Sequence, residues 1–184
     1  VEVLVNNAGI GVFGDVAGFD TADWDRTIAT NLSGVYYLTR AVLPGMIERG
    51  SGIIINVGSY IAIRPSPMAT AYATSKAALA RFSDCLALEV ADAGVQVFCV
   101  SPGLVLTDMT RDLPFIKDIP EEDFFQPEDI ASLACELASG SYGDLSGRFI
   151  HVGDDLQALK DNAGRIGEER LYQLSLHGLD GLIQ

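Results

Sequence analysis

Cationic side chains, cysteines and long apolar runs are all scarce in this chain of 184 residues. The 12 Lys and Arg stand against 25 Asp and Glu, which gives a net charge of −13. Nucleic acid and anionic lipid are bound by clustered Lys and Arg, so neither is expected as a partner. No apolar stretch approaches the roughly 18 residues of a membrane-spanning helix, so insertion into a membrane is not expected either.

The few cysteines and histidines make two further kinds of site unexpected. Cys85, Cys99 and Cys135 are widely spaced and form no C-x-x-C pair, which argues against a disulfide framework and against a zinc site. His151 and His177 have no second ligand at metal spacing, so we predict no metal. Because no basic and apolar leader is found, a reducing cytoplasm is the expected location.

Apolar residues are abundant, at 48%, and they alternate regularly with polar stretches. Short apolar runs predict strands over 1–5, 53–57, 95–100 and 148–152. The longer stretches between them predict helices over 21–48, 70–91 and 127–138. Asp20 or Thr21 is the expected N-cap of the first helix. Apolar strands separated by helices indicate an α/β fold with a parallel sheet covered on both faces.

Small and polar residues follow the predicted strands directly. Asn6-Asn7-Ala8-Gly9 follows the first strand, Gly58-Ser59 the second and Pro102-Gly103 the third. Ligands of such sheets bind at the carboxyl ends of the strands. We therefore expect these residues to meet at one site.

The strongest single pattern is Tyr72-x-x-x-Lys76 in the second predicted helix. Residues four apart share a helix face, and a nearby ammonium lowers the pKa of a phenol. Such a tyrosine can pass a proton to or from a carbonyl or hydroxyl oxygen. Alone the pattern is weak, since a solvated helix face gives it too. Tyr60 and Arg64 have the same spacing, but Arg64 precedes Pro65 in a predicted loop, and we interpret that pair as structural.

Two more polar residues support a catalytic role for Tyr72. Ser59 follows a buried strand, and Asn31 lies inside a predicted helix that an asparagine disfavours locally. Taken singly, Ser59 is equally well a turn or cap residue, and Asn31 a buried side chain bonded to backbone. Their combination with Tyr72 and Lys76 favours a catalytic set.

In this order and approximate spacing, the residues resemble those of the short-chain dehydrogenase/reductase family, from residue 1 to about 155. The resemblance implies a Rossmann-type doubly wound sheet and an NAD(P)-dependent oxidoreductase acting on an alcohol/ketone pair, with NAD or NADP left open. It implies that Tyr72 is the general acid/base and that Ser59 binds and polarises the substrate oxygen. Lys76 would lower the Tyr72 pKa and hold the nicotinamide ribose, and Asn31 would hold a water of a proton relay.

The same resemblance assigns residues to the cofactor and to partners. Asn6 and the backbone of Ala8 and Gly9 would lie along the cofactor, with Asn7 bracing the sheet. Further cofactor contacts are implied for Pro102, Gly103, Val105 and Thr107. The stretch 108–125, with Phe115, Phe124 and Phe125, matches the family's mobile lid over an apolar substrate. A homodimer or homotetramer of the full-length protein is implied as well.

The family's opening turn, Thr-Gly-x-x-x-Gly-x-Gly, has no counterpart here, because 1–5 matches the fourth strand of the family. We expect roughly 70–90 preceding residues to be absent, from two to three units of about 30 residues. Residues 1–155 would then be the C-terminal part of the nucleotide-binding domain, and 156–184 a tail of that domain. Gly9–Gly14 fits G-x-G-x-x-G, but helix signals begin only near Thr21, so we interpret it as a loop.

Without a neighbour for its first strand, the chain alone is expected to be poorly soluble and to bind cofactor weakly. A soluble monomer with micromolar affinity for NAD(P)H would contradict this expectation. Two alternatives to a short-chain oxidoreductase stay open. One is a non-catalytic binding module that keeps the fold; the other is a sugar epimerase or dehydratase, which usually carries a longer C-terminal domain.

Overall fold

The computed structural model has one sheet of four parallel strands in the order β1-β2-β3-β4. These strands are β1 (Val3–Asn6), β2 (Gly52–Val57), β3 (Val95–Ser101) and β4 (Phe149–His151). The structure describes residues 1–175, 177–178 and 181–182, and side chains up to 175 except those of 114 and 115. The side chains of Phe115 and His177 therefore lie outside the described residues. The predicted parallel α/β sheet is confirmed.

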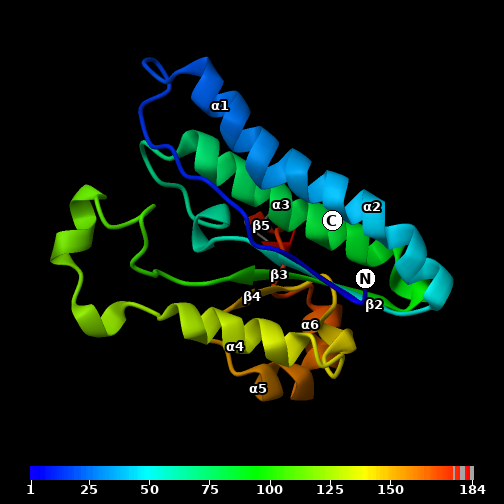
Figure 1. Cartoon of the computed structure of the whole chain (residues 1–184). Coiled ribbons are helices and arrows are strands. Elements are labelled where there is room, and N and C mark those ends of the chain that lie inside the picture. The colour runs from blue at the N-terminus through cyan, green and yellow to red at the C-terminus, as the bar shows by residue number, and fades with distance from the viewer. Residues whose placement is uncertain (176, 179–180, 183–184) are drawn as a thin grey trace.

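Helices cover both faces of the sheet (Figure 1). On one face lie α1 (Thr21–Ile28), α2 (Gly34–Arg49) and α3 (Thr70–Glu89). On the other lie α4 (Pro127–Leu137), α5 (Leu156–Asp161) and α6 (Ala163–Glu168). Successive strand residues point to opposite faces. In β2, Ile54 thus packs with the core under α2 and α3, and Ile53 and Ile55 pack with the core under α4 to α6.

The first predicted helix is not continuous. A π-helical turn, Ala29–Ser33, separates α1 from α2, and the backbone N–H of Gly34 donates to the carbonyl of Ala29 across it. Asn31 lies in this turn and is buried. Single π turns inside α-helices occur frequently at functional sites. As predicted, the helix begins at an Asp20 cap, whose carboxylate accepts from the N–H of Ala22 at 2.8 Å.

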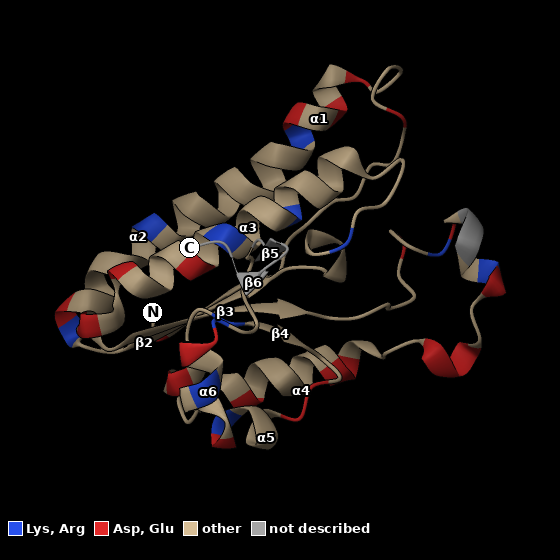
Figure 2. Cartoon of the chain, turned by 180° about the vertical axis from the view of Figure 1, so that it is seen from behind, with Lys and Arg blue, Asp and Glu red and all other residues tan. Residues whose placement is uncertain are grey.

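A long loop leads from β3 to α4. It contains two short 3-10 turns, Pro114–Asp118 and Glu121–Asp123, and comes back beside its own beginning, where Val105 pairs with Phe125 in an isolated bridge. In Figure 2 the ribbon is red, for Asp and Glu, over the second of these turns and at the start of α4. This part of the loop is therefore acidic.

The segment after β4 packs against the same core as the sheet. Leu156 and Leu159 of α5 and Ile166 of α6 are buried in the cluster that contains Phe98 of β3. A two-stranded antiparallel pair, His177–Gly178 with Gly181–Leu182, follows.

The two edges of the sheet differ. At the β4 edge, the N–H of Phe149 donates to the carbonyl of Tyr172 at 2.7 Å, so the later chain covers it. In the described part of the chain β1 pairs with β2 alone, and Val3 and Val5 are 37% and 45% exposed. The expectation of low solubility rests on this apolar edge and stays a prediction.

Membrane-spanning helices and metal-ligand clusters are both absent from the described residues. No helix there has the length and apolarity needed to cross a membrane. No three His, Cys, Asp or Glu side chains in the described part come together as metal ligands. Cys85, Cys99 and Cys135 are all free thiols.

Candidate active site

A cavity of about 730 Å³ opens at the carboxyl ends of the strands. Each strand contributes to its wall: Gly9 follows β1, Ser59 follows β2, Gly103 follows β3, and His151 ends β4. This is the edge where parallel sheets of this kind bind ligands. The sequence prediction that these segments meet is confirmed.

Most of the predicted site residues line this cavity. They are Gly9, Ser59, Tyr72, Lys76, Pro102, Gly103, Val105 and Thr107. Three predicted residues are absent from the lining: Asn6, Ala8 and Asn31. The Gly9–Gly14 segment belongs to a loop that precedes α1 at Thr21, so the interpretation of G-x-G-x-x-G as a loop is correct.

The position of Ser59 depends on Gly58. The N–H of Gly58 donates to the carbonyl of Val100 at 2.7 Å, which draws the end of β2 against β3. A Cβ at position 58 would lie 2.8 Å from the Cys99 sulfur, so the approach needs a glycine. Ser59 is then extended, and its Oγ accepts from the N–H of Ile61 at 3.4 Å as the cap of a 3-10 turn. The cap reading of Ser59 is therefore correct, and the residue lines the cavity as well.

Tyr72 lies in the first turn of α3. Burial raises the pKa of its phenol, and a hydrogen bond with the Ser59 side chain opposes the rise. The Phe13 ring packs against the Tyr72 ring at 5.8 Å between centroids. The phenol therefore keeps its proton at neutral pH.

Lys76 does not hold the Tyr72 pKa below its ordinary value, contrary to the sequence prediction. Its ammonium lies 5.8 Å from the centre of the Tyr72 ring and donates to the carbonyl of Val57 at 2.7 Å. The prediction of a lowered Tyr72 pKa is wrong for the chain as it stands, because desolvation of the phenol outweighs other influences. The spacing brings the residues to one face, but the long lysine side chain reaches past the phenol to β2.

The Lys76 ammonium is nearly buried, with 4% of the residue exposed. Burial lowers its pKa to about 8, an effect that the nearby Cys99 thiol opposes. A Cβ at Gly9 would lie 3.4 Å from Lys76 Nζ and 3.5 Å from Asn31 Oδ1. The absent side chain of Gly9 thus leaves room beside a buried cation at the cavity wall.

Asn31 fixes the loop after β1 to helix α3. Its Oδ1 accepts from the N–H of Ile10 at 2.9 Å, and its Nδ2 donates to the carbonyl of Ile10 at 2.8 Å and to Ser75 Oγ at 3.0 Å. Ser75 Oγ in turn donates to the carbonyl of Tyr72 at 2.7 Å. The side chain therefore matches the alternative of a buried amide bonded to backbone, and the water-holding role stays a prediction.

Asn6 and Asn7 are placed differently from what the resemblance implied. Asn6 is buried and donates to Asn56 Oδ1 at 2.8 Å, and Asn56 donates to Ser83 Oγ at 2.9 Å. Asn7 lines the cavity instead. The side chain that braces the sheet is thus that of Asn6, which corrects the expectation. Asn56 was missed, although an amide inside an apolar strand needs a buried partner.

The chain turns sharply after β3. Gly103 has φ of +70°, and a Cβ there would lie 2.3 Å from the Phe125 ring, so glycine is required. The N–H of Thr107 donates to Thr110 Oγ1 at 2.9 Å, and that hydroxyl donates to the carbonyl of Val105 at 2.7 Å. These bonds hold Val105 and Thr107, two of the predicted cofactor contacts, in a tight turn at the cavity wall.

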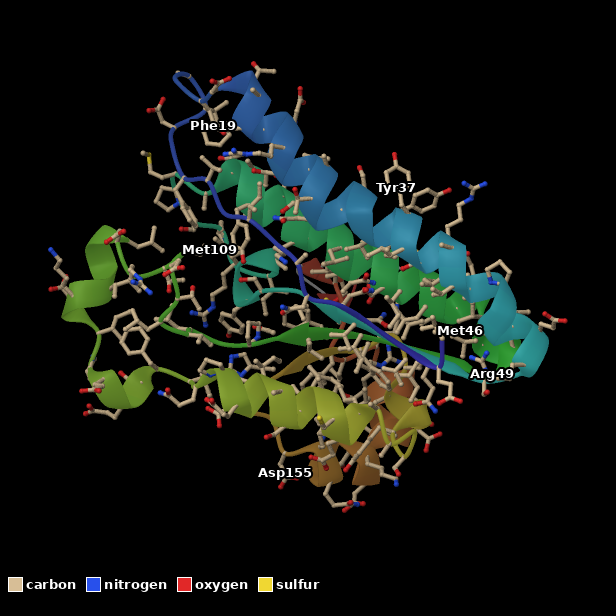
Figure 3. The ribbon with its side chains drawn as sticks, in the orientation of Figure 1. Phe19, Tyr37, Met46, Arg49, Met109 and Asp155 are labelled. Carbon is tan, nitrogen blue, oxygen red and sulfur yellow. The ribbon has the colours of Figure 1, made fainter. Side chains whose placement is uncertain are left out.

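Several apolar wall residues were not predicted. They include Phe13, Met109, Leu113 and Ile130. Met109 extends from the loop after β3 toward the loop after β1, where its sulfur would lie 3.0 Å from a Cβ at Gly11 (Figure 3). Nothing local in the sequence marks these residues, because only the folding of two loops brings them together. His151, considered only as a metal ligand, also lines the cavity.

The chain is similar to known proteins in sequence. A family model described as short chain dehydrogenase matches residues 1–115. A 3-oxoacyl-[acyl-carrier-protein] reductase from Buchnera aphidicola is 37% identical over 158 residues, which are 83% of this chain and 65% of that protein. A short chain dehydrogenase from Pseudocercospora fijiensis is 34% identical over an alignment that covers 96% of this chain and 64% of that protein.

Solved structures give the same result. A gluconate 5-dehydrogenase from Burkholderia cenocepacia, in complex with NADP and tartrate, matches with a TM-score of 0.78 and 29% identity. That match covers 86% of this chain and 65% of the other. ElxO with NADP bound matches with a TM-score of 0.74 and 25% identity, over 82% and 65% of the two chains.

The chain thus spans about 65% of the length of the curated relatives it matches. Within that span the fold and the family model agree. The chain belongs to the short-chain dehydrogenase/reductase family.

Proposed function

We propose that the full-length protein is an NAD(P)-dependent oxidoreductase that interconverts a small alcohol and its ketone, with Tyr72 as the general acid/base. One observation carries the proposal: Ser59, Tyr72 and Lys76 come from two different elements and line one cavity. A hydroxyl, a protonated phenol and a buried ammonium around one space suit proton transfer to a carbonyl oxygen.

The residues present fit the nicotinamide end of a dinucleotide. Lys76 provides a buried cation beside the open space at Gly9, and Val105 and Thr107 lie in the wall after β3. Two solved relatives contain NADP, which supports a dinucleotide and leaves the choice between NAD and NADP open. When bound, the nicotinamide supplies or accepts the hydride.

Residues of the chain itself then bind the substrate and protonate its oxygen. Ser59 and Tyr72 donate hydrogen bonds to the substrate oxygen, where negative charge develops during reduction. Tyr72 transfers its proton to that oxygen, and its raised pKa keeps the phenol protonated at neutral pH before the transfer. The Lys76 ammonium stabilises the phenolate that is left, and Asn31 holds the turn that carries Tyr72.

The loop at 108–125 contributes Met109 and Leu113 to the wall, so the substrate's non-reacting part contacts apolar surface. We expect a small alcohol or carbonyl compound as substrate, and a homodimer or homotetramer as the assembly.

The test is Tyr72→Phe in the full-length protein, with NADPH and NADH consumption measured on a panel of ketones and alcohols. We expect kcat to fall roughly 10³-fold, since a lost general acid costs about 10²- to 10⁴-fold. Fluorescence titration should show unchanged nucleotide affinity. The matched control is Tyr37→Phe, because Tyr37 projects from α2 into solvent and is 64% exposed (Figure 3).

Full activity of Tyr72→Phe would refute the mechanism. Nucleotide binding without turnover of any carbonyl compound would favour the non-catalytic binding module.

A further inference from the structure

His151 lies between two cavities. It lines the catalytic cavity of about 730 Å³ and a neighbouring one of about 830 Å³. Tyr60 and Ile61 are the other residues shared by both walls. Since Tyr60 directly follows Ser59, this boundary lies next to the hydroxyl proposed to bind the reacting oxygen. A substrate that extends from the first cavity toward the second passes His151.

The imidazole ring is held in one orientation. The backbone N–H of Gly153 donates to Nδ1 at 3.0 Å. The rings of Tyr60 and Phe125 contact it edge-on, at 5.6 and 5.5 Å between centroids and interplanar angles of 75° and 73°. Because an N–H can only donate, Nδ1 carries the lone pair, and the proton of the neutral ring is on Nε2.

The other polar groups of His151 all have hydrogen-bond partners within the protein. The N–H of His151 donates to Asp154 Oδ2 at 2.7 Å, and its carbonyl accepts from the N–H of Asp154 at 2.9 Å. For Nε2, in contrast, the described residues supply no hydrogen-bond partner. A donor fixed in direction at a cavity wall is what orients a bound ligand.

We propose that His151 Nε2–H donates a hydrogen bond to a second oxygen of the substrate, so that the site selects carbonyl compounds bearing a further carbonyl or ester oxygen. This inference rests on the proposed function. Ser59 and Tyr72 bind the reacting oxygen, and His151 binds the second one. His151 is thus a specificity-determining residue, outside the proton transfer itself.

The test compares two substrates that share the reacting group. Ethyl 3-oxobutanoate and 2-heptanone both have a methyl ketone and match in chain length, but only the former has a second carbonyl. The ratio of their kcat/KM values with NADPH is measured in the full-length wild type, in His151→Phe and in His151→Gln. Comparison between variants removes the difference in intrinsic reactivity of the two ketones.

We expect His151→Phe to lower the ratio roughly tenfold, which corresponds to about 1.4 kcal/mol. The loss should lie in the ester alone, with 2-heptanone changed less than about threefold, within the net value of one hydrogen bond. His151→Gln, whose amide restores a donor but not the Nδ1 contact, should keep the wild-type ratio. An unchanged ratio in His151→Phe, or an equal loss for both substrates, overturns the proposal.

A second readout does not depend on turnover. In the full-length protein labelled with ¹⁵N-histidine, ethyl 3-oxobutanoate should shift the Nε2 signal that His151→Gln removes, and 2-heptanone should leave it in place. No shift with the ester overturns the role of His151, whatever the activity. A shift without Tyr72-dependent NADPH oxidation supports His151 and contradicts the proposed function instead.

Discussion

Helix α3 carries two ionisable pairs, each with a buried member, that face different ends of the sheet. Tyr72 and Lys76 occupy its first half and face the cavity at the carboxyl ends of the strands. Arg81 and Asp84 occupy its second half, where Arg81 Nη1 lies 3.1 Å from Asp84 Oδ2. Burial is the largest influence on the pKa values of Tyr72, Lys76 and Asp84 alike.

The difference lies in the end of the sheet that each pair faces. The Arg81 and Asp84 pair lines a groove of about 480 Å³ at the amino ends of β3 and β4, together with Arg148 and Arg170. In open parallel sheets ligands bind at the opposite, carboxyl ends. A shifted pKa alone therefore marks both pairs equally, and only the position on the sheet separates the pair proposed to be catalytic from the other one.

The sharpest test of this comparison removes one cation from each pair. Lys76→Met should lower kcat/KM for carbonyl reduction roughly 10²-fold, because the charge that supports proton transfer from Tyr72 is lost. Arg81→Met should leave it within about threefold. Steady-state rates of the full-length proteins with saturating NADPH measure both. Equal losses in the two variants would mean that the pairs do not differ in function.

The next largest effect concerns the connection that holds Tyr72. Ser75→Ala removes the acceptor of Asn31 Nδ2 and the donor to the Tyr72 carbonyl, both inside the protein. We expect a loss of about 2 kcal/mol in the free energy of unfolding, since a buried amide loses a partner. Urea unfolding measures it.

The control for Ser75→Ala is Ser132→Ala. Ser132 also donates from a helix to a carbonyl one turn earlier, at 2.8 Å to Glu128, but it is exposed. Its replacement should cost less than about 0.5 kcal/mol, as exposed substitutions do. Similar costs at both serines would show that the Asn31 connection adds no stability.

A third, smaller effect is expected in the pH dependence of kcat/KM. Lys76 has a pKa lowered to about 8, so its ammonium is present below that pH and is lost above it. Tyr72, with its raised pKa, stays protonated over the same range. We expect kcat/KM for reduction to be level below about pH 8 and to fall about tenfold per pH unit above it. The profile of Arg81→Met should be the same, and a profile level to pH 10 would contradict the assignment to Lys76.

The features that the sequence predicted correctly were those set by local pattern. The strands and helices follow their apolar periods, and Tyr72 and Lys76 share a face because of their spacing in one helix. The π turn at Asn31 was not predictable, because its partners Ile10 and Ser75 are distant in sequence. Asn6 and Asn7 were exchanged because a shift of one residue at a strand end reverses the face of a side chain.

The prediction of a lowered Tyr72 pKa was wrong for a related reason. The spacing predicts that Tyr72 and Lys76 share a helix face. It does not predict that the Lys76 ammonium donates its hydrogen bond to the Val57 carbonyl instead. Likewise, the orientation of His151 depends on the rings of Tyr60 and Phe125, which two separate loops contribute. Such contacts arise from tertiary structure alone.

The smallest expected effect tests the structural pair. Burial raises the Asp84 pKa from 3.8 to about 6, against the opposing charges of Arg81 and Arg148. The folded state therefore binds this proton more tightly than the unfolded state, so the associated stability is full below about pH 4 and is lost as the pH rises to about 6. The Asp84 carboxyl is only partly desolvated, which reduces the effect to about 1 kcal/mol.

Asp84→Asn removes this titration. The free energy of unfolding of the variant minus that of the wild type should rise by about 1 kcal/mol between pH 4 and pH 7.5, measured by urea unfolding. Asp92→Asn, an exposed position in the turn after α3, should show no such rise. If Asp84→Asn instead changed kcat/KM and left the pH dependence of stability intact, the groove at the amino ends of the strands would be coupled to the reaction, and the distinction between the two pairs would fail.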